Sequence, residues 1–163
     1  MLMMIAIVMG MAIPAILAAN ASMSTATSQR LQIDDIQSKS SVSITSIQAP
    51  PLGNQISFVL NNTGSTKLWD YQKFSVLVTY DALGSSRKTE ELAYQGISPA
   101  PSQGFWSISQ FNNDYADPRI INPGESAKLV CHVSSPLLGA GGTVTVALST
   151  DAGVVTSRSG AII

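Results

Sequence analysis

The pattern of hydrophobic and polar positions divides the chain into two regions. Seventeen of the first 19 residues are apolar, and the first charged side chain is Arg30. Asn20–Lys39 contains no Gly or Pro, so helical structure is expected to continue through it. From residue 40 the apolar positions alternate with polar ones, which is the period of a half-buried strand. We therefore predict an N-terminal hydrophobic helix over residues 1–39 and a second domain over residues 40–163.

The second region contains seven or eight short segments with strand-like alternation. They are separated by turn-forming runs such as Asn61–Gly64 and Thr150–Gly153. No helical period lies between them, so the predicted fold class is α+β, a long N-terminal apolar α-helix followed by an antiparallel immunoglobulin-like β-sandwich. The predicted strands lie within residues 42–47, 56–60, 74–80, 88–94, 105–108, 127–133, 143–149 and 154–163.

The first 19 residues admit three interpretations. Their number is close to the roughly 20 residues that cross a membrane as a helix. A secretory signal peptide would place its cleavage site near Ala18–Ala21, but no basic segment precedes the apolar one. A permanent membrane anchor is the second interpretation. The third, which we favour, is a helix exposed as a new N-terminus when a short basic leader is removed.

A helix that is apolar on every side must be buried on every side, in lipid or among other helices. Small residues along it would allow close helix packing. Pro14 removes a hydrogen bond to the carbonyl of Gly10, so we expect a kink between these two residues. The residues predicted to pack in such a helix core are Met1, Ile5, Val8, Gly10, Ala12, Ile13, Pro14, Ile16 and Leu17.

Composition and charge argue against several classes of function. Charged residues make up 12% of the chain and the net charge is −1, so there is no basic surface for nucleic acid. One cysteine and one histidine exclude an internal disulfide and supply common zinc sites poorly. Cys131 and His132 are adjacent on a predicted strand and face opposite sides, so they cannot form a catalytic pair, and Cys131 is expected in the core. We predict that the protein is not an enzyme and has no cofactor, metal site or small-molecule substrate.

The carboxylates offer little further chemistry. Asp34-Asp35 and Glu90-Glu91 are sequential pairs whose side chains diverge, and we interpret both as solvated. Asn112, Asn113, Asp114 and Asp117 form the only acidic and amide cluster, but their spacing does not match a known calcium loop. We interpret the run Asn122–Glu125 as a simple turn between extended segments, because Pro and Gly preset its backbone angles.

Two sequons are candidate N-glycosylation sites. Asn61 begins the run Asn61-Asn62-Thr63 at the end of a predicted strand, and Asn20 begins Asn20-Ala21-Ser22 on the helix. A glycan would project more readily from Asn61, since burial of the helix would leave no room for one at Asn20.

Taken together, these features resemble the archaellin-like branch of the type IV pilin superfamily. The resemblance rests on the apolar N-terminus Met1–Ala19, the continuing helix to about residue 38 and the single β-sandwich. The segments Leu60–Gly64 and Ile121–Glu125 also resemble segments of archaellins and of archaellum stator-type proteins. Ile5 departs from the pattern of bacterial pilins, which carry a glutamate at the fifth mature position.

The resemblance implies a structural subunit of an extracellular filament, an archaellum or an archaellum-like pilus for motility or adhesion. Its partners would be further copies of itself, the membrane before assembly, an assembly platform and a leader peptidase. It would begin as a membrane-embedded precursor and end in a filament on the cell surface. The alternative is a membrane-anchored, non-polymerising binding module of the stator type, which contacts the cell surface layer through its sandwich.

Overall fold

The computed structural model of the protein describes residues 23, 25–32, 34–35, 37–84, 86–114 and 116–163. The chain divides into two compact units, residues 1–36 and 37–163. The described residues between 23 and 39 are helical, and Thr27 Oγ1 donates a hydrogen bond to the Met23 carbonyl at 2.8 Å. The apolar helix expected over Met1–Ala19, its nine predicted packing residues and Asn20 all lie outside the described residues. In the described part of the chain, no helix is both long and apolar enough to span a membrane.

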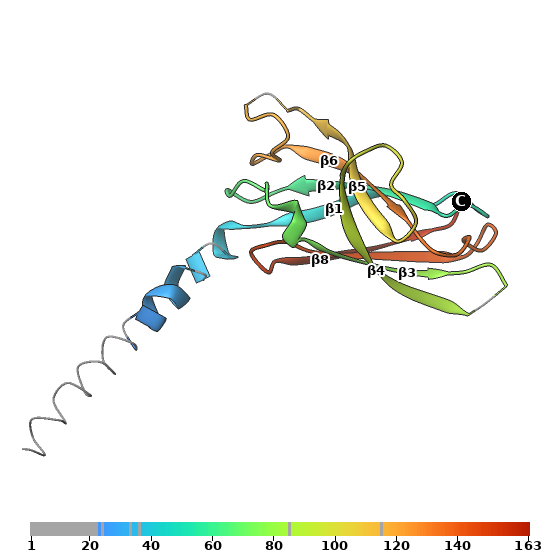
Figure 1. Cartoon of the computed structure of the whole chain (residues 1–163), viewed down its shortest axis with the longest axis horizontal. Coiled ribbons are helices and arrows are strands. Elements are labelled where there is room, and N and C mark those ends of the chain that lie inside the picture. The colour runs from blue at the N-terminus through green and yellow to red at the C-terminus, as the bar shows by residue number, and fades with distance from the viewer. Residues whose placement is uncertain (1–22, 24, 33, 36, 85, 115) are drawn as a thin grey trace, which may run out of the picture. The chain divides into compact units, whose positions relative to one another are not determined.

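The second unit is built almost entirely of β-strands (Figure 1). One short 3-10 turn, η1 (Tyr71–Lys73), precedes the third strand and was not predicted. The strands are β1 (Val42–Gln48), β2 (Gln55–Asn62), β3 (Ser75–Asp81), β4 (Arg87–Ile97), β5 (Phe105–Asn112), β6 (Ser126–His132), β7 (Thr143–Ser149) and β8 (Val155–Ala161).

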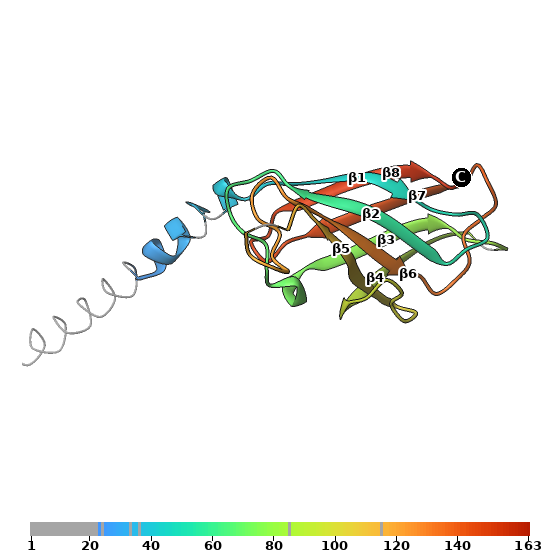
Figure 2. The same cartoon turned by 90° about the horizontal axis from the view of Figure 1, so that it is seen from above.

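The eight strands form one sheet folded into two layers. Their order is β1-β2-β6-β5-β4-β3-β7-β8, so each strand is hydrogen-bonded to its neighbours and only β1 and β8 are edges. These two edges lie side by side (Figure 2), and Arg158 Nη1 of β8 donates to the Ile44 carbonyl of β1 at 3.3 Å. The result is a nearly closed immunoglobulin-like sandwich, which confirms the predicted sandwich architecture.

One strand pair corrects the prediction that all strands are antiparallel. β4 pairs antiparallel with β3 as far as Leu92, then crosses to the other layer and pairs with β5 in parallel from Ala93. A parallel pair normally needs a crossover of a dozen residues or more. Here the residues 98–104 suffice, because the parallel register extends only from Ala93 to Ile97. Alternation of apolar residues carries no information on strand direction, so the sequence pattern could not show this crossing.

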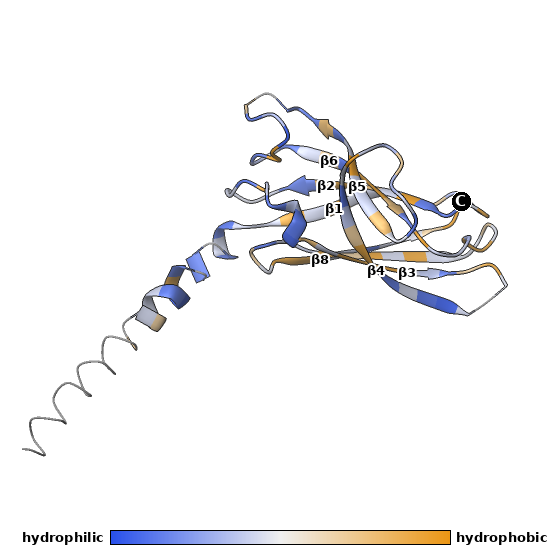
Figure 3. Cartoon of the chain, in the orientation of Figure 1, coloured by the Kyte–Doolittle hydropathy of each residue, from blue (hydrophilic) through white to orange (hydrophobic). Residues whose placement is uncertain are grey.

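The core lies between the two layers and is made mainly by alternate residues of β1, β2, β3, β5, β6 and β7. Trp106, Tyr80 and Phe58 are the largest fully buried side chains. Cys131 is also fully buried, as its alternation with Leu129 predicted, and burial raises the pKa of its thiol. The first half of β4, by contrast, is hydrophilic (blue in Figure 3) and carries Arg87, Lys88, Thr89, Glu90 and Glu91.

Candidate interaction site

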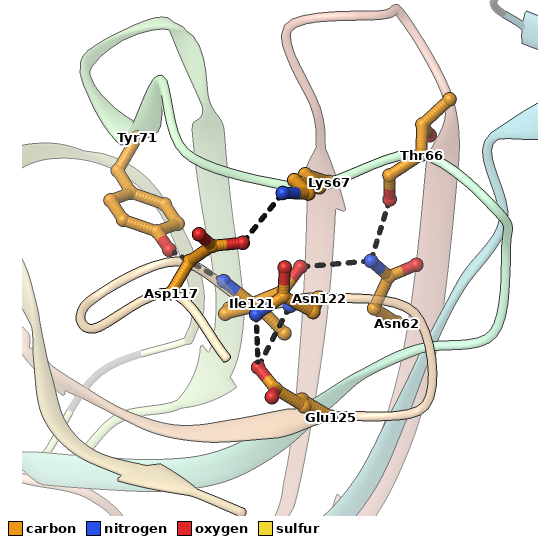
Figure 4. A network of polar contacts seen from close by, with 8 residues as sticks. All are labelled: Asn62, Thr66, Lys67, Tyr71, Asp117, Ile121, Asn122 and Glu125. Carbon is orange, nitrogen blue, oxygen red and sulfur yellow. Dashed lines mark hydrogen bonds and ion pairs between the residues drawn. The ribbon is translucent and has the colours of Figure 1, made fainter. Parts of the chain in front are cut away.

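A network of polar contacts joins two loops, the one that follows β2 and the one between β5 and β6 (Figure 4). Asn62, the last residue of β2, lies at its centre and is 1% exposed. Its side-chain amide donates to the carbonyls of Thr66 and Ile121 at 2.7 and 2.9 Å, and its Oδ1 accepts from the Gly64 amide at 3.1 Å. Asn62 therefore satisfies backbone groups of two loops that are far apart in sequence.

A buried carboxylate completes one side of this network. Glu125 is 9% exposed, and its Oε2 accepts hydrogen bonds from the backbone and side-chain nitrogens of Asn122, both at 2.9 Å. Gly124 between them has a φ of +81°, which favours glycine. The segment is a turn, as interpreted from the sequence. The turn also buries the Glu125 carboxylate, which accepts two hydrogen bonds inside the protein.

Tyr71 of η1 fixes the other side of the network. Its hydroxyl donates to the Leu68 carbonyl at 2.8 Å and accepts from the Ile121 amide at 3.2 Å. Burial raises the pKa of this phenol, so it stays neutral. Near it, Lys67 and Asp117 form an exposed ion pair at 2.5 Å. Such an exposed pair contributes little stability, and the buried hydrogen bonds hold the loops together.

The loop after β2 also binds the residues that lead into β1. The amides of Thr63 and Gly64 both donate to the Ser41 carbonyl at 2.9 Å, and the Ser65 amide donates to the Lys39 carbonyl at 2.8 Å. A Cβ atom on Gly64 would lie 2.4 Å from the Ser41 amide nitrogen, so no larger residue fits there without a backbone shift. The loop thus holds the start of the sandwich in one backbone conformation.

A second polar cluster lies toward the opposite end, around Glu90. Tyr80 donates to Glu90 Oε1 at 2.5 Å, the Ser134 amide donates to Oε2 at 2.8 Å, and the Ser134 hydroxyl also donates to Oε1. Partial burial acts to raise the pKa of Glu90, but the hydrogen bonds outweigh it and the pKa is lowered. The prediction that Glu90 is merely solvated is therefore wrong. Glu90 lies on the inward side of β4 and accepts bonds from a loop that the sequence did not place beside it.

The outer faces of both layers are rich in uncharged hydroxyl and amide side chains. On one face a row of hydroxyls crosses four strands, with Thr79 Oγ1 2.9 Å from Thr89 Oγ1 and Thr145 Oγ1 2.9 Å from Ser159 Oγ. On the other face, formed by β1, β2, β6 and β5, Lys128 is the only Asp, Glu, Lys or Arg among the described strand residues. Such faces suit a partner that forms many hydrogen bonds.

A groove of about 690 Å³ crosses that second outer face. Outward-facing side chains of β2, β5 and β6 form its floor, and its rim includes Pro50, Pro99 and Ile163. Two irregular positions border it, a register shift between Thr45 and Gln48 in β1 and another between Ile108 and Gln110 in β5. Bulges of this kind redirect side chains and are common next to binding sites. The groove is lined by Gln48, Ala49, Pro50, Gln55, Ser57, Pro99, Ser109, Gln110, Lys128, Val130 and Ile163.

Asn61, His132 and Asp114, which were also singled out from the sequence, do not line this groove. Asn61 is half-buried in β2, and its side-chain amide donates to Thr45 Oγ1 at 3.1 Å, so its glycosylation stays a prediction. His132 Nδ1 lies 2.8 Å from the Pro101 carbonyl. Asp114 accepts from the Arg119 amide at 3.2 Å. Among the described residues, no group of three or more His, Cys, Asp or Glu side chains could hold a metal ion.

A comparison with family models identifies the sandwich. Residues 37–158 match the model described as "Conserved flagellar protein F, immunoglobulin-like domain". The match covers most of the chain, and the protein therefore belongs to this archaellum-related family. No curated protein matches the sequence. The expectation of an archaellum-related chain is confirmed, but the family is that of flagellar protein F and not that of archaellin itself.

Solved structures share the fold at low sequence identity. The archaellum periplasmic stator protein complex FlaF and FlaG from Sulfolobus acidocaldarius matches with a TM-score of 0.52 and 19% identity, over 73% of this chain and 87% of that chain. The stator protein FlaG from the same organism matches with a TM-score of 0.50 and 19% identity, over 74% and 99%. The archaeal flagellum of Methanospirillum hungatei strain JF1 matches with a TM-score of 0.54 and 14% identity, over 99% and 96%.

Proposed function

We propose that the protein is a non-polymerising, stator-type module of the archaellum, which contacts the cell surface layer through its β-sandwich. The observation that carries this proposal is the family match over residues 37–158, which covers the whole sandwich except the last three residues of β8 and the two residues that follow it. Similar folds in a periplasmic stator complex support it. The main expectation from the sequence, a homopolymeric filament subunit, receives less support than this alternative.

The geometry of the sandwich is consistent with a module that bears load. A stator-type protein must hold a fixed position while a force acts on it. The hydrogen bonds from the loop after β2 to Lys39 and Ser41 fix the backbone where the sandwich begins. The buried Asn62 side chain fixes that loop by a hydrogen bond to the Thr66 carbonyl and joins it to the Ile121 carbonyl of a second loop. A force applied where the sandwich begins would thus be opposed by these hydrogen bonds and by the packed core.

A filament subunit is the second candidate. One observation favours it, the match to the archaeal flagellum of Methanospirillum hungatei over 99% of this chain. The identity of 14% shows a shared fold alone. In a filament the outer faces of the sandwich would be buried between copies, whereas a stator-type module would present at least one of them to a different partner.

Immunogold labelling of the full-length protein on intact cells distinguishes the two functions. For a stator-type module we expect label at the cell envelope, none along the filaments, and a deletion strain that still assembles filaments but swims poorly. Label at regular intervals along the filaments, together with loss of filaments in the deletion strain, would overturn the proposal in favour of a filament subunit. Labelling with antibody against a known filament component controls for access to the filament surface.

A further inference from the structure

The groove on the outer face of β1, β2, β6 and β5 has a chemically uniform lining. Its polar side chains are amides and hydroxyls, with Lys128 as the only charged side chain and no Asp or Glu. Amides and hydroxyls both donate and accept hydrogen bonds. The groove therefore matches a ligand that presents many hydroxyl-type groups together with a negative charge.

Three of the lining side chains have polar groups that the sandwich does not use. Among the described residues, no hydrogen bond or ion pair is formed by the side-chain amides of Gln55 and Gln110 or by the ammonium group of Lys128. Other lining groups are occupied: the Ser57 hydroxyl donates to Gln48 at 3.2 Å, and the Ser109 hydroxyl donates to the Lys128 carbonyl at 3.0 Å. Gln55, Gln110 and Lys128 are thus available to a ligand.

The register places these groups at two separate positions along the strands, with Gln110 and Lys128 together and Gln55 further along β2. Gln110 is directly opposite Lys128, and Lys128 is opposite Val59 of β2. Gln55 lies four residues before Val59 on the same strand, a separation of about 13 Å at 3.3 Å per residue. Between them, Ser57 is paired with Val130, which is 6% exposed and also lines the groove. The spacing fits an extended ligand rather than a single small ion.

The same geometry argues against a peptide as the ligand. An extended peptide commonly binds by adding to a sheet edge or by inserting side chains into apolar pockets. The groove lies across the faces of β2, β5 and β6, and each of these strands is paired on both sides. Its floor holds no aromatic side chain and no deep apolar pocket. The proline rings of Pro50 and Pro99 offer flat C–H surfaces at its rim instead.

We propose that this groove binds an acidic saccharide, a chain of sugars that carries carboxylate groups, with Lys128 as its cationic contact and Gln55 and Gln110 as hydrogen-bonding contacts. The inference rests on the proposed function, because it names the chemistry of the surface that a stator-type sandwich would hold. The proposal places the contact between the sandwich and the cell surface layer on the outer face of β1, β2, β6 and β5.

Calorimetric titration of the full-length protein with trigalacturonate tests this assignment. The protein is kept in a polyoxyethylene detergent, because a detergent with a sugar headgroup would compete for the groove. We expect measurable binding that weakens as salt is raised, and about tenfold weaker binding for Lys128→Gln, the loss of one charge-assisted hydrogen bond. Lys128→Arg should bind nearly as well as the wild type. Lys73→Gln is the matched control, since it removes one positive charge from a lysine paired with Asp70 outside the groove and should change nothing.

Three results would overturn the assignment. They are no binding of trigalacturonate by the folded wild type, binding that Lys128→Gln leaves unchanged, and equally tight binding of maltotriose or of a triglutamate peptide. Near-ultraviolet circular dichroism of every variant shows that the sandwich is folded in each case. Failure here with label still at the cell envelope would reject the saccharide alone, whereas label along the filaments would reject the stator-type function whatever the groove binds.

Discussion

The two ends of the sandwich each contain a glutamate that accepts several hydrogen bonds, and the comparison shows how burial changes what such a group does. Glu125 is 9% exposed and is bonded to the turn that it terminates. Glu90 is only partly buried and receives bonds from Tyr80 and from a loop more than 40 residues away. The first acid shapes a local turn inside a network centred on Asn62. The second holds a distant loop against β4.

The difference teaches that the two clusters should respond differently to their environment. The hydrogen bonds of the Asn62 side chain join it to neutral backbone groups and do not depend on protonation. The cluster around Glu90 has a carboxylate as its main acceptor, with a lowered pKa. The contribution of Asn62 should change little with pH, whereas the cluster around Glu90 should loosen when its carboxylate is protonated.

The largest loss of stability is expected from Gly64→Val, which would disrupt the contact of the loop after β2 with the residues that lead into β1. Its Cβ would lie 2.4 Å from the Ser41 nitrogen and 2.6 Å from the Lys39 carbonyl oxygen, both of them backbone atoms that cannot move independently. We expect a loss of about 4 kcal/mol in the free energy of unfolding, or failure to fold. Urea denaturation followed by tryptophan fluorescence measures it. Gly139→Val is the control, because no heavy atom lies within 4 Å of a Cβ there.

Asn62→Ala should have the next largest effect. It removes two donors and leaves the buried Ile121 carbonyl without its side-chain partner. We expect a loss of about 2–3 kcal/mol, because the substitution removes three hydrogen bonds of a buried side chain at about 1 kcal/mol each. The neighbouring Asn61→Ala serves as the control and should cost under about 1 kcal/mol, since Asn61 is half-buried and bonds only to side chains. Equal losses for both variants would contradict a special role for the buried network.

Glu90→Gln should sharpen the comparison through its pH dependence. The folded pKa of Glu90 lies below the ordinary value of 4.5, so the charged form stabilises the fold above that value. This contribution is lost as the pH falls through the folded pKa. At pH 7 we expect Glu90→Gln to be less stable than the wild type by about 1 kcal/mol, because the group is partly exposed.

Measuring the free energy of unfolding of Glu90→Gln and Asn62→Ala at pH 7 and again at pH 3 distinguishes the two clusters. The gap between wild type and Glu90→Gln should shrink at pH 3, whereas the gap for Asn62→Ala should stay nearly constant. A constant gap for Glu90→Gln across this range would show that the carboxylate charge does not hold the loop. Glu91→Gln, on the exposed side of the same strand, is the matched control.

The smallest effect is expected from Thr79→Ala on the outer face. Its hydroxyl contacts that of Thr89 on the neighbouring strand, an exposed cross-strand pair. Such pairs contribute about 0.2–1 kcal/mol, so we expect a loss near 0.5 kcal/mol in urea denaturation. A loss as large as that of Asn62→Ala would mean that the hydroxyl row is part of the stabilising framework and not simply a polar surface.

Much of the sandwich could be predicted from local sequence. Alternation of apolar residues located all eight strands to within a few residues, and it placed Cys131 and Leu129 in the core, because side chains on a strand point alternately to its two faces. Turn-forming runs such as Asn61–Gly64 marked where strands end. The low content of charge and the single histidine predict neither nucleic-acid binding nor common zinc chemistry, and both exclusions stay predictions.

The pairing of the strands was decided only by the tertiary structure. Alternation shows which face of a strand is buried, but not which strand lies next to it or in which direction. The crossing of β4 from one layer to the other, and its parallel pairing with β5, therefore left no signal in the sequence. The meeting of Glu90 with Ser134 has the same cause, since two residues 44 positions apart come together only when the strands between them are placed.

The groove around Lys128 was also decided only by the tertiary structure. Sequence alone determined that Lys128 lies on the outward face of its strand, because Ala127 and Leu129 on either side of it are apolar. Its place beside Gln110 depends on the order β2-β6-β5 and on the register shift in β5. The same order places Gln55 on β2, four residues from the residue that is opposite Lys128. The side-chain period is local and can be read from the chain, whereas a binding surface is assembled from neighbours that only long-range strand pairing brings together.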